Sequence, residues 1–372
     1  MISISVAGVQ IENWTEYEIE SSILQVGSFS LKRPFDAAAF RLCTPDAAVT
    51  IQIDGIAVIT GFIDDRSKVT DRGMNEMEIA GRSRLGRMVQ ESAPYIGYDG
   101  LDLFEIAKRL ADPWFLKITP SNARNRTVMR GRGRKVSSGA EPLVVKVRKK
   151  TWQVEPGQAR MKILEQLASE AGYLVWDAGD GNELVIGKPN RTQDVQWLVA
   201  NAAPGSNLAS TATKLTIKES TADRFSLIMA VGSAAGDSIN YGASTISKRG
   251  VVRNGPGIDG TGVDFDHPKR LILSERTIAD ISEADEIARR EMARRDFGKL
   301  TASATLRYHG QVTSGTTPTI FTYDTLARVI DEELDPPLDD VFFVHTVKYR
   351  AGRTDGESTE LVMVPRNTEI VK

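Results

Sequence analysis

The sequence contains one cysteine, Cys43, among 372 residues. A single thiol cannot form a disulfide within the chain, so the protein folds in a reducing compartment or does not depend on oxidation, and Cys43 is expected to be a small apolar filler. Histidine is almost as scarce, because His267, His309 and His345 are far apart and none has a second histidine three or four residues away. This spacing disfavours a zinc site and histidine-based catalysis.

Long apolar runs are absent as well. No stretch approaches the roughly 20 residues of a transmembrane helix. The N-terminal sequence MISISVAGV also lacks the basic start and the long apolar core of a signal peptide. We therefore expect no membrane insertion, and we expect the chain to be made in the cytoplasm.

Motifs of common enzyme chemistry are missing too. The sequence has no G-x-x-x-x-G-K-[ST] phosphate loop, and Ser83 lies in GRSRLG, which lacks the G-x-S-x-G spacing of a nucleophile elbow. The adjacent acids Asp64-Asp65 and Asp339-Asp340 would face opposite sides of a strand, which disfavours acid/base pairs. We expect no catalytic residue and no cofactor.

A cation site is the remaining small-ligand possibility in the sequence. Asp259, Asp264 and Asp266 could offer oxygen ligands, but they lack the spacing of a Ca²⁺-binding loop. A solvated turn is the favoured interpretation, and no metal site is predicted.

The net charge of -2 hides a strong asymmetry. The segment 117–150 holds eleven basic residues and one acid, Glu141, so it carries +10 and the rest of the chain carries -12. Such a loop could bind nucleic-acid phosphates without sequence specificity, or it could dock on an acidic protein surface. No aromatic residue lies between Phe115 and Trp152, which disfavours base stacking. The candidate interaction residues are Arg124, Arg126, Arg130, Arg132, Arg134 and Lys135.

Residues 1–95 have the pattern of an all-β domain. Apolar residues alternate with polar ones in 2–6 and again in 49–53. Asp54-Gly55 is a hairpin signal, and Ile56–Phe62 is expected to return antiparallel. Several short strands with such turns predict a small barrel.

Residues 96–206 change to a mixed pattern. Leu103, Ile106, Ala107 and Leu110 have helical spacing, and Pro113 ends that helix. A second helix is expected over 163–171 with Gly172 as its stop, followed by a hairpin of 173–177 and 183–187. We predict an inserted α/β domain whose basic loop covers 117–150.

Residues 207–372 return to strands. A Gly-rich excursion over 232–262 interrupts them, and a capping box at Ser282–Asp285 predicts a helix over 283–297. Pairs four residues apart support that helix: Asp285–Arg289, Glu286–Arg290 and Glu291–Arg295. Strands 341–349 and 358–364 form a closing hairpin. The predicted fold class is α+β, mostly β, with two small β-barrel domains and the inserted α/β domain.

Several segments resemble one known family. The residues that carry the resemblance are Gly81-Arg82-Ser83, Met88-Val89 and Ser92-Ala93, Val6–Val9 with Trp14, Thr60-Gly61-Phe62, His345–Tyr349 and Glu360–Val364. Together they resemble the baseplate hub proteins of contractile-tailed phages, the Mu-type tail hub family. On this basis the segment from Gly81 is structural, a strand and a following turn that lead out of the first barrel.

The resemblance implies a structural, non-enzymatic role in the virion. Such hubs are homotrimers in which two barrels per chain give six near-equivalent positions, so the ring joins the tail tube protein to the central spike protein and contacts baseplate wedge proteins. Assembly would occur in the host cytoplasm, and DNA would pass the channel without specific binding. It also implies that residues 207–372 superpose on the first barrel.

Two other function classes stay open from the residues alone. One is a tail-associated cell-wall hydrolase, for which no placed carboxylate pair or zinc set can be assembled. The other is a nucleic-acid-binding protein that uses the basic loop.

The acidic remainder of the chain favours a protein partner for the basic loop. Replacing Arg130, Arg132 and Arg134 with serine is then expected to weaken ring or baseplate assembly at moderate salt, measured by light scattering. Unchanged assembly with impaired DNA delivery would reverse this assignment in favour of DNA.

Overall fold

A computed structural model of the chain describes residues 2–71, 74–94, 101–115, 117–121, 156–179, 181–232, 248–258, 260–262, 265–274, 278, 280–311, 319–353 and 356–370. They form two compact units, one of residues 1–216 with 303–366 and one of 217–302 with 367–371. The predicted fold class is confirmed: the protein is mostly β, with a large, mainly antiparallel sheet and a few helices. The predicted boundaries at 95/96 and 206/207 stay predictions.

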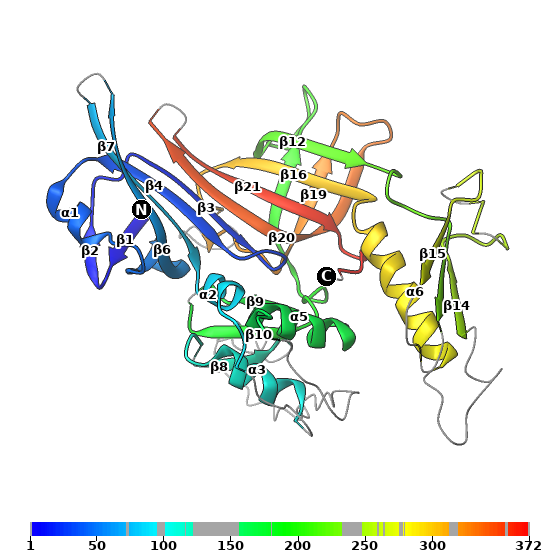
Figure 1. Ribbon diagram of the computed structural model, residues 1–372. Helices are drawn as coiled ribbons and strands as arrows, with labels where there is room; N and C mark the ends of the chain where they lie inside the picture. Colours follow the sequence, from blue (N-terminus) through cyan, green and yellow to red (C-terminus); the bar gives the residue numbers. More distant parts are fainter. Residues whose placement is uncertain are drawn as a thin grey trace, which may run out of the picture. The chain divides into compact units, whose positions relative to one another are not determined.

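The N-terminal strands of the first unit form the predicted barrel-like set (Figure 1). They are β1 (Ile2–Val6), β2 (Val9–Ile11), β3 (Glu16–Ser22), β4 (Ser28–Pro34), β5 (Ala48–Ile53), β6 (Ile56–Asp71) and β7 (Met74–Ser83), with helix α1 (Ala37–Leu42) between β4 and β5. The predicted hairpin at Asp54-Gly55 is confirmed, since both residues have positive φ and β5 pairs antiparallel with β6. Alternate side chains such as Val49, Ile51 and Ile53 are buried, as the period of two predicts.

The C-terminal strands of this unit continue the same sheet. They are β11 (Val195–Asn201), β12 (Ala212–Glu219), β16 (Leu300–Arg307), β19 (Thr325–Asp331), β20 (Leu338–Gly352) and β21 (Gly356–Pro365), with the small pair β17 (Gly310–Gln311) and β18 (Thr319–Ile320) beside them. Among the described residues, thirteen strands share the sheet, in the order β12-β16-β21-β20-β3-β4-β7-β6-β5-β1-β2, with β11 and β19 joined at β20. The predicted closing hairpin is confirmed as β20 and β21.

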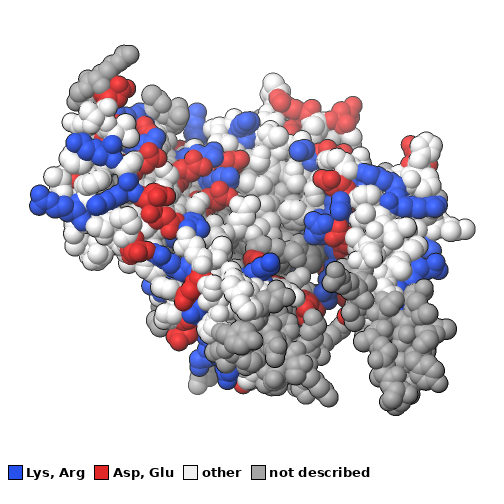
Figure 2. All heavy atoms as spheres, in the orientation of Figure 1, with Lys and Arg blue, Asp and Glu red and all other residues white. Residues whose placement is uncertain are grey.

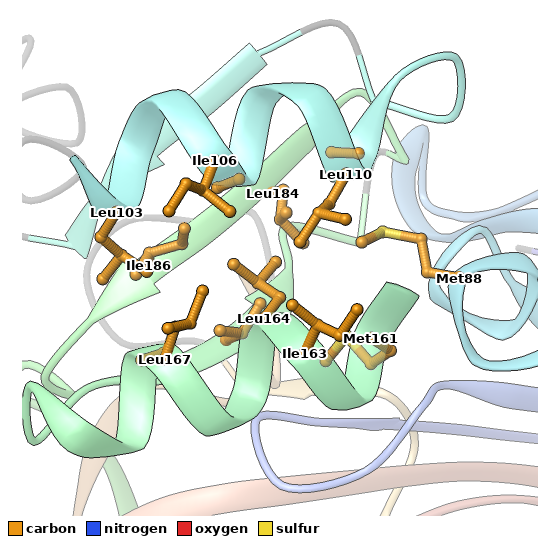
Figure 3. Close-up of a cluster of buried hydrophobic side chains, with 14 of the residues drawn as sticks. Met88, Leu103, Ile106, Leu110, Met161, Ile163, Leu164, Leu167, Leu184 and Ile186 are labelled. Atoms are coloured by element: carbon orange, nitrogen blue, oxygen red, sulfur yellow. The ribbon is translucent and has the colours of Figure 1, made fainter. Parts of the chain in front are cut away.

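In chain order, a small α/β layer is inserted after the first strand set and before the second. It contains α2 (Leu85–Gln90), α3 (Leu103–Ala111), α5 (Arg160–Glu170), β8 (Lys117–Pro120), β9 (Leu174–Asp177) and β10 (Glu183–Gly187). Figure 3 shows apolar side chains of α3 and α5 meeting over the strands, with Met88 of α2 at the end of the cluster. Both predicted helices and the predicted β9–β10 hairpin are confirmed, and Gly172 ends α5 with φ +71°.

The second unit is a separate small layer that the sequence did not predict as such. Its strands β13 (Leu227–Gly232), β14 (Lys248–Arg253) and β15 (Arg270–Ser274) form a sheet in the order β14-β13-β15, and helix α6 (Ile281–Asp296) packs on it. Part of the predicted Gly-rich excursion is therefore a strand, β14. Gly250 allows the close approach, because a Cβ there would lie 2.2 Å from the backbone of Ala284 in α6.

Helix α6 corrects one detail of its prediction. Its N-cap is Asp280, whose side chain accepts from the Glu283 amide, and not Ser282. The predicted pairs of Glu286 with Arg290 and of Glu291 with Arg295 are present. Asp285 instead accepts a hydrogen bond from the Val251 amide, because it faces β14 and not solvent.

No helix among the described residues is long and apolar enough to cross a membrane.

Candidate functional site

The arginines of the segment that follows β7 are all engaged in structural contacts. Arg82 Nε lies 2.6 Å from Asp64 Oδ2, Arg84 donates to the carbonyl of Trp114, and Arg87 pairs with Asp46. No phosphate cradle is formed, because each guanidinium is already used in a contact with β6, with the α/β layer or with the loop before β5. The predicted turn after the strand is in fact helix α2, since Leu85 and Met88 are buried on one face of it.

The end of this segment fastens the α/β layer through a partly buried ion pair. Glu91 accepts from Arg160 at 2.8 Å and from Trp114 Nε1 at 2.8 Å. Arg160 also donates to the carbonyls of Leu110 and Asp112, which closes the C-terminal end of α3. The segment Gly81–Ala93 is therefore a joint between the first strand set and the α/β layer.

Ser83 lies in a setting unsuited to nucleophilic attack. Its side chain is buried at 2% exposure, and its Oγ has no hydrogen-bond partner among the described residues. A serine nucleophile requires an adjacent base and access to substrate, and Ser83 has neither in this part of the chain.

The two histidines of the first unit are engaged with hydroxyl groups of neighbouring side chains. Nε2 of His309 lies 2.7 Å from the Tyr17 hydroxyl and its Nδ1 lies 2.9 Å from the Thr359 hydroxyl, so the ring ties β3 to β21. His345 lies in β20 against Thr346. Among the residues that the structure describes, no group of three or more His, Cys, Asp or Glu is arranged to hold a metal ion.

His345 predicts a measurable pH dependence of stability. Burial lowers its pKa to about 4, and burial lowers the pKa of His309 as well. The folded state keeps His345 neutral while the unfolded state takes up a proton near pH 6.5, so stability that is present above pH 6.5 is lost as the pH falls toward 4. We expect a loss of roughly 2 to 3 kcal/mol over this window.

The His345→Gln variant isolates this contribution. Its thermal melting temperature should fall less between pH 6.5 and pH 4 than that of the unchanged chain, measured by calorimetry in matched buffers. Parallel pH profiles for the two proteins would contradict the assignment to His345.

The acidic residues considered as acid/base pairs or cation ligands form no common site among the described residues. Asp339 pairs with Arg328 at 2.6 Å on the surface, and Asp340 accepts from the amide of Val341. Asp266 is exposed, whereas Asp259 and Asp264 lie outside the described residues. Cys43 is fully buried, in agreement with a filler role, and burial raises its pKa to about 11.

The candidate interaction residues of the basic loop are outside the part of the chain that the structure describes. Their role stays a prediction. On the described surface in Figure 2, basic and acidic side chains are interspersed. The six residues are Arg124, Arg126, Arg130, Arg132, Arg134 and Lys135.

Two pockets of the first unit, as far as the described residues line them, lack a catalytic arrangement. One of about 280 Å³ is lined by apolar, hydroxyl and amide side chains, with Asp324 as its carboxylate. A groove of about 940 Å³ lies beside α3, but Asp102 and Glu105 in it form the capping box of that helix. These two carboxylates accept backbone amides, so they are not a free acid/base pair.

The most informative feature is the junction of the two strand sets. Residues Tyr17–Ser22 of β3 pair antiparallel with Thr346–Ala351 of β20, far away in the sequence. Ser22 and Thr346 hydroxyls lie 2.7 Å apart in the buried part of the junction. Lys348 pairs with Glu20 at 3.3 Å and Arg350 with Glu18 at 3.1 Å. Opposite charges thus face each other across the two strands.

The two strand sets are built in the same way. The strands β3, β4, β5, β6 and β7 correspond to β12, β16, β19, β20 and β21, respectively, and have corresponding neighbours, except that β3 and β20 also pair with each other. Each set contains a long antiparallel hairpin with one register shift, between Ile63 and Asp65 in β6 and between Val344 and Thr346 in β20. When the two register shifts are aligned, Ile63 of β6 corresponds to Val344 of β20. The other residues of β6 and β20 then correspond at the same difference in residue number.

Backbone hydrogen bonds agree with this alignment. The Asp46 amide donates to the Ile63 carbonyl at 2.9 Å, and the Asp324 amide donates to the Val344 carbonyl at 2.9 Å. Both aspartates have positive φ, +70° and +58°. A non-glycine residue in this conformation is uncommon, so its occurrence at matching points is specific.

Three further pairs of hydrogen bonds match, and each pair of corresponding strands keeps its own constant difference in residue number. They are Phe35 N to Asn75 O with Tyr308 N to Glu357 O, Arg84 N to Thr60 O with Arg366 N to Val341 O, and Thr15 Oγ1 to Lys32 O with Thr213 Oγ1 to Thr305 O. One difference is that β1 pairs antiparallel with β5 whereas β11 pairs parallel with β19. The superposition of residues 207–372 on the first barrel stays a prediction, which these shared registers support.

Comparison with known protein families identifies a relative of the N-terminal strand set. Residues 1–83, which end with β7, match the family described as Mu phage baseplate assembly protein GpP-like, N-terminal. No curated protein matches this sequence. The resemblance predicted from the sequence is thus confirmed for the N-terminal strand set.

Solved structures share the fold over almost the whole chain. The tail protein from Neisseria meningitidis MC58 is 20% identical, with a TM-score of 0.75 over 99% of this chain and 97% of that one. The 43 kDa tail protein of prophage MuSo2 from Shewanella oneidensis is 19% identical, with a TM-score of 0.74 over 99% of each chain. The E. coli c3393 protein, described as a type VI secretion component similar to T4 tail proteins gp27 and gp5, is 7% identical, with a TM-score of 0.54 over 99% of this chain and 78% of that one.

Proposed function

Starting from the baseplate-family match of residues 1–83, we propose that this chain is a structural baseplate hub of a contractile phage tail. Three copies form a ring with six near-equivalent barrel positions, which joins the tail tube protein to the central spike protein. Baseplate wedge proteins contact the outside of the ring, and DNA passes its channel without specific binding. The protein acts in the virion and is not an enzyme.

The duplicated strand set is the observation that carries this proposal. Two strand sets with matching registers lie in one chain, joined edge to edge through β3 and β20. A closed ring of three such chains would repeat this barrel-like unit six times, which suits a sixfold tube on one side and a threefold spike on the other. The engagement of Arg82, Arg84 and Arg87 in structural contacts supports a scaffold role.

Light scattering coupled to size exclusion tests the oligomeric state of the full chain. We expect the mass of three chains, and electron micrographs should show rings that bind the tube and spike proteins of the same tail. A protein that stays monomeric at high concentration and joins neither partner would overturn the proposal.

A further inference from the structure

The strand β6 has an open edge where its counterpart β20 is covered. In β20, β19 pairs with the first part and β3 takes over the same edge from Thr346 to Ala351. Along β6, β5 pairs with the first part of the same edge, up to Phe62. Beyond it, no described strand pairs with residues 65–71 on that edge. Most of residues 65–71 are exposed, whereas Thr346, Val347 and Tyr349 are buried.

The strand β12 has the complementary open edge. It is the counterpart of β3 and stands at the end of the sheet, with β16 as its strand neighbour among the described residues. Its residues are exposed or half-buried throughout, unlike Tyr17, Ile19 and Ser21 of β3. A long, exposed strand edge is a ready template for pairing with another chain.

We infer that β12 of one copy pairs antiparallel with residues 65–71 of β6 in the next copy. The pairing repeats the contact that β3 makes on β20 within the chain, and it rests on the ring of the proposed function. Because donor edge and acceptor edge differ, the contact is head to tail and closes a ring when the rotation allows.

The internal repeat fixes the register of this contact. Two correspondences transfer the β3–β20 register: Ile63 of β6 matches Val344 of β20, and Thr15 before β3 matches Thr213 of β12. Counting along the strands from these residues places Ser67 opposite Lys218 and Val69 opposite Thr216. The same register places Arg66 opposite Glu219 and Asp71 opposite Lys214, two pairs of opposite charge. The existing junction also places opposite charges face to face, in the pairs Lys348–Glu20 and Arg350–Glu18, although at other positions along the strands.

Alternative registers are disfavoured by charge. A shift by one residue in one direction sets Asp65 against Glu219 and Arg66 against Lys218. A shift by one residue in the other direction sets Lys68 against Lys218. Like charges directly opposite each other destabilise a strand pair, so the sequence of β12 selects the register that the repeat predicts.

The side chain of Arg66 is already held for this contact. Its Nη1 donates to the Phe40 carbonyl at 2.5 Å and its guanidinium lies 4.4 Å from the Phe40 ring centroid, which fixes it on the face of β6 that α1 covers. A carboxylate of Glu219 arriving on the same face would meet a pre-positioned cation, with less side-chain entropy to lose.

Charge reversal tests the contact in the full-length protein. Arg66→Glu and Glu219→Arg should each raise the dissociation constant of the ring roughly tenfold, and the double variant should restore it. Light scattering gives the trimer fraction, and circular dichroism melts control for folding. Arg328→Glu, which breaks an exposed pair elsewhere in the chain, is the matched control and should leave assembly unchanged.

Cysteine pairs test the register directly. Ser67→Cys with Lys218→Cys should give disulfide-linked dimers and trimers on oxidation, whereas Ser67→Cys with Glu219→Cys, which faces the other side, should not. Trimers that form without either cross-linking or a charge-reversal effect would overturn this inference and leave the proposed function standing. Equal cross-linking of both pairs would also overturn the register. A chain that never forms trimers would overturn the proposed function itself.

Discussion

Replacing Gly81 with valine is expected to destabilise the first strand set by about 4 kcal/mol. A Cβ at this position would lie 2.1 Å from the Phe62 carbonyl oxygen and 2.5 Å from Cζ of Phe29. Gly81 lies in β7 and pairs with β4 on one side and β6 on the other, so the β6 backbone cannot move away without breaking the sheet. Urea unfolding followed by tryptophan fluorescence measures the loss.

Gly352→Val is the matched control for this variant. Gly352 also lies in a strand, but a Cβ there meets no atom within 4 Å. We expect a change within about 1 kcal/mol. Equal melting of the two variants would contradict the close approach of the strands at Gly81.

Replacing Trp197 with alanine is expected to cost about 4 kcal/mol in the second strand set. Trp197 in β11 is 2% exposed, its ring meets the Phe321 ring edge to face at 5.1 Å, and its Nε1 donates to the Thr325 hydroxyl at 2.9 Å. Truncation removes a large buried surface and leaves the Thr325 hydroxyl with one fewer partner. Calorimetry of the full chain records the lowered melting temperature.

The Trp197→Phe variant separates packing from hydrogen bonding. It keeps most of the ring volume and loses the Nε1 donor, so we expect a smaller loss of about 1 to 2 kcal/mol. An alanine variant no worse than the phenylalanine variant would show that Trp197 does not anchor β11 to β19.

These core positions matter for assembly because the open edges belong to the same sheet. Residues 65–71 of β6 are aligned by β7, and β7 depends on the close packing at Gly81. A variant that loosens this packing should therefore also impair ring formation, whereas charge reversal at the exposed Glu219 should impair the ring alone. The two effects separate folding from assembly in one set of measurements.

The sequence alone determined the elements whose signals are local. The four apolar residues of α3 recur at helical spacing and are all fully buried, and Asp54-Gly55 adopts the positive φ values that a tight hairpin needs. The family resemblance also came from short motifs, and the match of residues 1–83 confirms it. These features depend on residues that are close in the chain.

The pairing of distant strands was missed because it depends on residues far apart in the chain. The strand β3 reads EYEIESS and alternates polar with apolar residues, but its pairing with β20 joins residues more than 300 positions apart, and no local pattern indicates that partner. Every residue type except proline can both donate and accept a backbone hydrogen bond, so strand pairing leaves little trace in a sequence. The strand β14 was missed because it lies within the Gly-rich segment 232–262, which the sequence analysis treated as an excursion between strands.

Only the tertiary structure decided how the strand sets correspond. Asp64 occupies the bulge of β6 and His345 the bulge of β20, so the side chains differ where the hydrogen bonds agree. It is the backbone that repeats, and a repeat of backbone geometry cannot be read from dissimilar side chains. The open edges of β6 and β12 became visible only when their covered counterparts were in place, because an edge is defined by the neighbour it lacks.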